Sequence, residues 1–146
     1  MNKRLVITFL VALSSVCGLC AQSYEEDFNA VQQAFQERLK TTPNALKNHL
    51  TTFPYTPYSD EIYLMEGVLY TEKGKYKQAT KVFNKITAKN LSRETQPMLY
   101  FYGGYALIQQ KQYEKALSLF LRLKNQKSTY TPHAKYYAGY CYYCMQ

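Results

Sequence analysis

An internal repeat limits the folds open to this 146-residue chain. Residues 63–86 align with residues 100–123 at a constant offset of 37. The coincident residues are aromatic, apolar or glycine: Tyr63/Tyr100, Gly67/Gly104, Tyr76/Tyr113, Ala79/Ala116, Phe83/Phe120 and Ile86/Leu123. A repeat of this length is one supersecondary unit that buries its apolar face only against its neighbours. The sequence therefore predicts stacked copies of a small motif rather than a globular pocket.

Each copy is predicted to be a pair of helices, because its apolar residues recur at spacings of three and four and no alternating strand pattern appears. In the central copy, Asp60 is expected to cap a helix over residues 61–72, and Gly74 to permit the turn into a second helix over residues 75–87. In the next copy, Pro97 suits the first turn of a helix that runs to about Gln110, and residues 112–125 form its partner. The predicted fold class is all-α.

Partial copies lie on both sides. Gly139 follows Gly104 by 35 residues, in a helix that Pro132 opens. Upstream, Ala45 precedes Ala79 by 34 residues, and the stretch before it has apolar residues at helical spacing. We therefore expect one repeat domain over residues 24–146, with a degenerate unit at about 25–53, repeats at 60–93 and 97–130, and a partial repeat at 132–146.

The first 21 residues have the pattern of a secretory signal: a basic start, an apolar stretch of about 12 residues and a small-residue ending. That stretch is short for a membrane span, which needs roughly 20 residues, so no transmembrane helix is expected after its removal. Cys17 and Cys20 raise the alternative of a lipoprotein, but Val16 and Leu19 precede them where a small residue is usual. Both readings predict an exported protein, periplasmic or associated with the outer membrane.

The charge of the chain points to no particular partner. Removing Lys3 and Arg4 with the signal leaves 16 basic against 10 acidic residues, a net charge of +6. The lysines near residue 75 are interspersed with Glu72 and Gln78, as expected of a solvated helix surface. Binding to nucleic acid or an anionic membrane stays an alternative, with steep salt dependence as its mark. The export signal argues against nucleic acid.

The repeat resembles the tetratricopeptide repeat (TPR), a motif of about 34 residues with aromatic, glycine and alanine positions. The central copy matches it at Gly67, Tyr70, Gly74, Tyr76, Ala79 and Phe83. The next copy has Leu107 for the usual tyrosine and Lys111 for the turn glycine, and it keeps Tyr100, Gly104, Tyr113, Ala116 and Phe120. The resemblance covers residues 44–146, and the Pro-Tyr-Thr linkers are similar to joints of envelope TPR proteins. It implies antiparallel helix hairpins stacked as a right-handed α-solenoid.

The resemblance also implies a concave binding groove, lined by the first helix of each repeat. Carried over, the partner-binding residues are Leu64, Val68, Phe101, Tyr105, Ile108, Tyr136, Tyr140 and Tyr143. Tyrosine and phenylalanine are common at interfaces, so we expect a peptide or partner protein there. The alternative is a structural segment of a larger polypeptide, whose faces are buried by further repeats, or an oligomer.

No catalytic or cofactor motif is recognisable. Cys141 and Cys144 form a C-x-x-C inside a predicted helix, where two packed small residues are the expectation rather than a zinc or redox site. His49 and His133 belong to no nucleophile motif, and the acidic run at residues 25–27 suits a flexible start or helix N-terminal charges. We expect a non-catalytic protein with no metal and no cofactor.

Overall fold

The computed structural model describes residues 23–146, which divide after Thr56 into an N-terminal and a C-terminal compact unit. Every regular element in these residues is helical, and none of them is a strand, which confirms the all-α prediction. The expected signal segment, with Cys17 and Cys20, lies outside the described residues.

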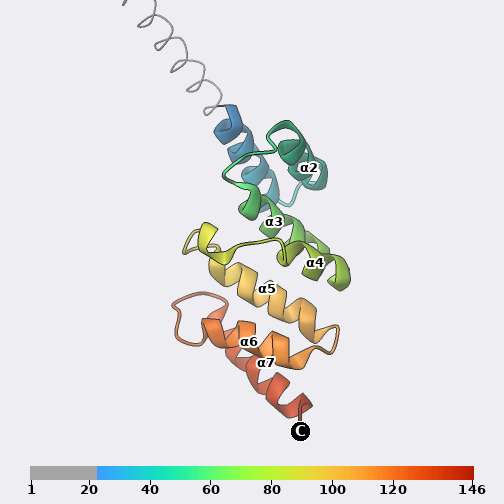
Figure 1. Ribbon diagram of the computed structural model, residues 1–146, viewed down its shortest axis with the longest axis vertical. Coiled ribbons are helices and arrows are strands. Elements are labelled where there is room, and N and C mark those ends of the chain that lie inside the picture. Colours follow the sequence, from blue (N-terminus) through green and yellow to red (C-terminus); the bar gives the residue numbers. More distant parts are fainter. Residues whose placement is uncertain (1–22) are drawn as a thin grey trace, which may run out of the picture. The chain divides into compact units, whose positions relative to one another are not determined.

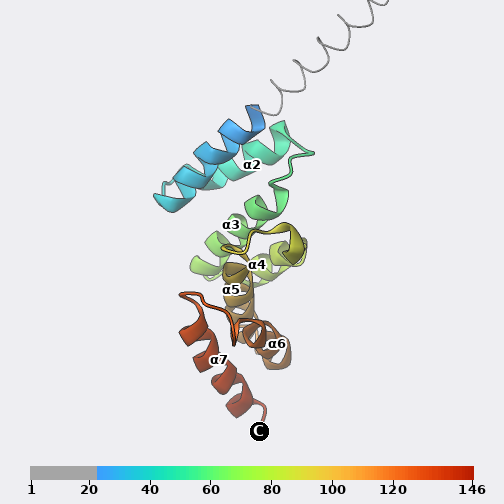
Figure 2. The ribbon, with the colours of Figure 1, turned by 90° about the vertical axis from the view of Figure 1, so that its left-hand side faces the viewer.

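The C-terminal unit is a stack of helix hairpins (Figures 1 and 2). Its elements are α3 (Ser59–Glu72), α4 (Tyr76–Phe83), the short 3-10 helix η1 (Ala88–Asn90), α5 (Gln96–Ile108), α6 (Tyr113–Leu123) and α7 (Thr131–Cys144). The hairpins are α3 with α4 and α5 with α6, while α7 packs on both α5 and α6. Successive first helices also touch, α3 against α5 and α5 against α7.

Each hairpin closes around a glycine and a phenylalanine at the repeat offset. A Cβ placed on Gly67 would collide with the Phe83 ring, and one on Gly104 would lie 2.7 Å from two atoms of the Phe120 ring. The missing side chain lets each ring seat directly on the first helix. Ala79 and Ala116, one turn before these rings, are both fully buried. The repeat predicted from the sequence is therefore a repeat of packing.

The turns inside the hairpins are also equivalent. Gly74 has a φ of 70° and Lys111, 37 positions later, has a φ of 59°. Both turns are closed by the same pair of backbone hydrogen bonds. In the first turn, Lys75 N–H donates to Tyr70 O at 2.8 Å and Gly74 N–H to Thr71 O at 3.0 Å. In the second, Gln112 N–H donates to Leu107 O at 3.0 Å and Lys111 N–H to Ile108 O at 2.8 Å. This is the Schellman motif, which favours glycine at its left-handed position.

Replacing Lys111 with glycine should therefore stabilise the chain. A lysine in the left-handed region costs about 1 kcal/mol relative to glycine, because its Cβ crowds the backbone. We expect Lys111→Gly to raise the free energy of unfolding by about 1 kcal/mol, and Gly74→Ala to lower it by a similar amount. Urea unfolding followed by circular dichroism measures both, and equal effects of the same sign would contradict the turn equivalence.

The start of α3 differs from the expectation for Asp60. The helix begins at Ser59, and no side chain caps it. Asp60 is buried and accepts a hydrogen bond from Asn90 Nδ2 at 2.7 Å. Its carboxylate thus fixes the long connection between α4 and α5, in which Leu91 is also buried. Satisfying a buried carboxylate takes precedence over capping.

The other helix ends lie close to the predicted ones, except in α4. Pro97 and Pro132 stand in the first turns of α5 and α7, as predicted. Helix α4 ends at Phe83 rather than near residue 87. There the chain turns out of the helix through tight bonds from Lys85 N–H to Val82 O at 3.0 Å and Ile86 N–H to Phe83 O at 3.1 Å.

The N-terminal unit is a degenerate hairpin of helical residues 23–36 and α2 (Thr42–Thr52). Arg38, with a φ of 56°, occupies the turn, which is closed by bonds from Leu39 N–H to Ala34 O at 3.0 Å and Arg38 N–H to Phe35 O at 3.2 Å. The buried residues of α2 are Thr42, Leu46 and His49, which precede Ala79, Phe83 and Ile86 by 37. Ala45, matched to Ala79 from the sequence, is only half-buried, so that alignment was wrong.

Candidate partner-binding face

The groove residues expected on α3 lie in the core. Leu64 and Val68 are each 1% exposed, on a helix that packs against both α4 and α5. Side chains without accessible surface cannot contact a partner. Their assignment to the groove is therefore corrected, and the reason is that apolar residues at these positions are covered by the neighbouring helices.

The expected groove residues on α5 are covered by the next helix. Ile108 is buried, and Phe101 and Tyr105 are half-buried. The Phe101 ring stacks on Tyr130 at 5.1 Å between centroids and meets Tyr137 at 6.2 Å. Tyr105 meets Tyr137 edge-on at 5.5 Å. Such aromatic contacts add roughly 0.5–1.5 kcal/mol each beyond simple burial. Phe101 and Tyr105 thus hold α7 in place, and Ile108 is inaccessible.

The expected residues on α7 are exposed. Tyr136 is 70% and Tyr143 is 75% exposed, and Tyr140 lies between them. Tyr142 and Met145 add further exposed apolar surface to the same helix end. We call Tyr136, Tyr140 and Tyr143 the tyrosine face. Clustered exposed aromatic residues are typical of an interaction site, whereas single exposed apolar residues are not informative.

The repeat explains why these three sets differ. Leu64, Val68 and Thr71 on α3 correspond at an offset of 37 to Phe101, Tyr105 and Ile108 on α5, and these correspond at an offset of 35 to the tyrosine face on α7. Helix α5 packs against α3, and α7 packs against α5. The tyrosine face is therefore the position at which the next helix of the stack would pack.

The tyrosine face consists of phenol side chains, with no lysine, arginine or carboxylate among its three residues. Hydrogen bonding to Cys144 raises the pKa of Tyr140, and the nearby Tyr113 adds to the effect. The rings of Tyr113 and Tyr140 meet edge-on at 6.3 Å, which fixes one side of the face. Lys135 is the one lysine, arginine or carboxylate residue in the α7 sequence. A face of this kind favours apolar and hydrogen-bonding partners over highly charged ones.

The cysteines of α7 have different environments. Cys141 is fully buried, and Cys144 is partly exposed; both are free thiols. Burial raises the pKa of the Cys141 thiol, and the neighbouring Cys144 adds to this. A raised pKa means less thiolate and lower reactivity. Cys141 corresponds at an offset of 35 to the fully buried Ala106, which agrees with its interpretation as a packed small residue.

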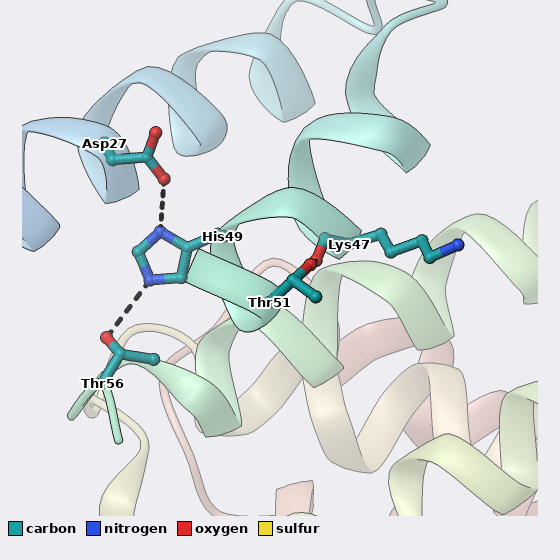
Figure 3. A network of polar contacts seen from close by, with 5 residues as sticks. All are labelled: Asp27, Lys47, His49, Thr51 and Thr56. Atoms are coloured by element: carbon teal, nitrogen blue, oxygen red, sulfur yellow. Dashed lines mark hydrogen bonds and ion pairs between the residues drawn. The ribbon is translucent and has the colours of Figure 1, made fainter. Parts of the chain in front are cut away.

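A polar network in the N-terminal unit was not expected from any sequence pattern (Figure 3). His49 is fully buried, with Nδ1 2.6 Å from Asp27 Oδ2 and Nε2 3.2 Å from Thr56 Oγ1. Asp27 therefore belongs to a helix and pairs with His49, rather than to a flexible start. The order acid, histidine, hydroxyl is that of a catalytic triad, but here both the His49 ring and the Thr56 hydroxyl are buried. The network joins the helical residues 23–36, α2 and the chain after α2.

A hollow of about 460 Å³ lies beside α4 and α6. It is lined by Thr80, Asn84, Leu107, Gln112, Lys115, Ser118 and Leu119. These side chains supply hydroxyls, amides and one cation, without a carboxylate, histidine or thiol among them. Within residues 23–146, no three potential metal ligands come together.

Comparison with known proteins decides the family. The family model described as Iml2/Tetratricopeptide repeat protein 39 matches residues 5–146. The chain belongs to this family. Searches of the curated proteins and of the solved structures found no match. Membership of the Iml2/TPR39 family agrees with the helix hairpins and identifies the chain as a TPR-like interaction scaffold whose partners are proteins. No helix in the described part of this family member is long and apolar enough to cross a membrane.

Proposed function

We propose that the chain is a non-catalytic scaffold of the cell envelope that binds a partner protein or peptide through the tyrosine face of α7. The observation that carries the proposal is the contrast between equivalent positions. Leu64 and Val68 on α3 and Ile108 on α5 are buried, whereas Tyr136 and Tyr143 on α7 are 70% and 75% exposed. Large aromatic residues contribute disproportionately to binding free energy when a partner covers them.

Export of the protein is part of this proposal. It is supported by the basic start, apolar stretch and small-residue ending of residues 1–21. A periplasmic or outer-membrane location follows from it, with lipid attachment as the less favoured variant. Edman sequencing or mass spectrometry of the protein from cells tests this directly, since a mature chain that starts at Met1 would contradict export through a cleaved signal.

Removing the two most exposed residues of the tyrosine face should strongly weaken partner binding. Tyrosines that become buried in an interface contribute about 2 kcal/mol each, so Tyr136→Ala with Tyr143→Ala is expected to weaken capture of envelope partners by more than tenfold. Both side chains lie outside the core, so the thermal melt should stay unchanged. Crosslinking followed by quantitative mass spectrometry measures the captured proteins.

Tyr55→Ala is the matched control. Tyr55 is 98% exposed and lies in the N-terminal unit, outside the tyrosine face. Its replacement removes the same chemical group and should leave capture unchanged. Equal capture by the double variant and the wild type would exclude the tyrosine face as the binding site.

A second candidate function, a structural segment of a longer polypeptide, is supported by the way in which the helices stack. Because α7 packs against α5 as α5 packs against α3, a further repeat of a longer polypeptide would fit on the tyrosine face. The reading frame beyond Gln146 distinguishes the two, since a continuing helical repeat would give the tyrosine face a structural role.

A further inference from the structure

Gly139 is the repeat glycine of α7, and its surroundings differ from those of its two counterparts. Gly67 faces the Phe83 ring, and Gly104 faces the Phe120 ring. In both cases the phenylalanine follows its glycine by 16 residues. A Cβ built on Gly139, by contrast, meets no atom within 4 Å. The repeat glycine thus faces a phenylalanine ring on α3 and on α5, whereas the equivalent position on α7 is open. We call this position on each helix the seat.

The open seat is continuous with the tyrosine face. Residues three and four positions away on a helix are surface neighbours. For Gly139 these neighbours are Lys135, Tyr136, Tyr142 and Tyr143, all of which are exposed. We call this open position at Gly139, flanked by three tyrosines and Lys135, the socket. An incoming ring can make edge and face contacts with them, as Phe120 does inside the chain with Tyr137 at 5.7 Å.

The chain itself shows which kind of element fills such a seat. Phe83 lies on helix α4 and Phe120 on helix α6. Four positions before each phenylalanine is a fully buried alanine, Ala79 or Ala116. The small residue lets the two helix backbones approach closely enough for the ring to reach the glycine. The ring and the small residue are one turn apart and therefore share one helix face.

We propose that the partner of this scaffold binds as a helix with a small residue and a phenylalanine four positions later, and that its ring occupies the socket at Gly139. The inference rests on the proposed function, since it specifies the chemistry of the partner for the same face. In helix-in-groove recognition, a bound helix is anchored by apolar side chains that are spaced three or four residues apart.

A peptide with the α6 sequence tests the inference. The probe is a helix-stapled peptide of residues 111–126, which carries Ala116 and Phe120, added to the ¹⁵N-labelled full chain. We expect saturable shifts of the Gly139 amide resonance. A peptide with Phe120→Ala should bind at least tenfold more weakly, because the ring is its anchor. Equal binding of the two peptides, or shifts that spare Gly139 and its neighbours, would overturn the proposal.

The substitution Gly139→Leu in the protein provides a second test of the inference. The new Cβ meets no atom within 4 Å, and leucine favours a helix, so we expect the variant to fold with its side chain in the socket. We expect at least a tenfold loss of peptide affinity. Undiminished affinity would contradict the inference, as would a wild-type chain that is already dimeric through this face and does not bind the peptide. If Tyr136→Ala with Tyr143→Ala abolishes capture of the natural partner and Gly139→Leu does not, the proposed function stands and the helix specificity fails.

Discussion

Truncation of Phe120 to alanine should lower the free energy of unfolding by about 3–5 kcal/mol. The ring is 1% exposed, seats on Gly104 and stacks on Tyr137 with an interplanar angle of 20°. Glycine has no side chain that could move into the space, so the cavity stays largely open. A loss of this size is a large fraction of the stability of a small domain. Denaturant unfolding followed by circular dichroism measures it.

Leu121→Ala is the control for Phe120→Ala. Leu121 is the next residue of α6 and lies exposed on its outer side. Its truncation should cost less than about 1 kcal/mol, because little surface is removed from the core. Similar losses for the two variants would show that Phe120 does not fill the seat between α5 and α6.

The second large effect is expected from Gly104→Ala. The new Cβ would lie 2.7 Å from two atoms of the Phe120 ring, which is 1% exposed and packs against Phe101 and Tyr137. Overpacking of this kind costs about 1–3 kcal/mol and exceeds the gain of roughly 1 kcal/mol from the helix propensity of alanine. We expect a net destabilisation of about 1–2 kcal/mol. Unfolding curves of the variant and the wild type under the same conditions test this.

Gly139→Ala, the equivalent substitution in α7, should have the opposite sign. Its Cβ meets no atom within 4 Å, so the propensity gain of up to about 1 kcal/mol remains uncompensated. Gly104 is buried against the Phe120 ring, whereas Gly139 is exposed and faces no phenylalanine. A destabilising Gly139→Ala would mean that a side chain occupies the seat on α7.

The fold was predictable because the residues that determine it recur. Gly67, Ala79 and Phe83 return 37 positions later as Gly104, Ala116 and Phe120, and they pack in the same way. Even Lys111 takes the left-handed conformation of Gly74, since the hydrogen-bonded turn determines its backbone. A pattern that recurs in the sequence indicates that the conformational preferences of its residues agree with the way in which the helices pack.

The candidate site was predictable only in part. The residues carried over to the groove share one register, and their exposure depends on which of the described helices pack on them. Leu64, Val68 and Ile108 are covered, whereas the tyrosine face is not. The hydrogen bonds of Asp60 with Asn90 and of His49 with Asp27 join residues 30 and 22 positions apart, so no local pattern indicates them. Pairings of this kind are decided by tertiary structure.

Nuclear Overhauser effects from the glycine Hα protons examine the repeated seat in solution. The structure predicts strong effects between Gly67 and the ring protons of Phe83 and between Gly104 and those of Phe120, with ring-current shifts of both glycines. Gly139 should show no effect to any phenylalanine of the free chain. Absence of the Gly104–Phe120 effect, or a phenylalanine contact at Gly139, would contradict a stack of equivalent hairpins with an open seat on α7.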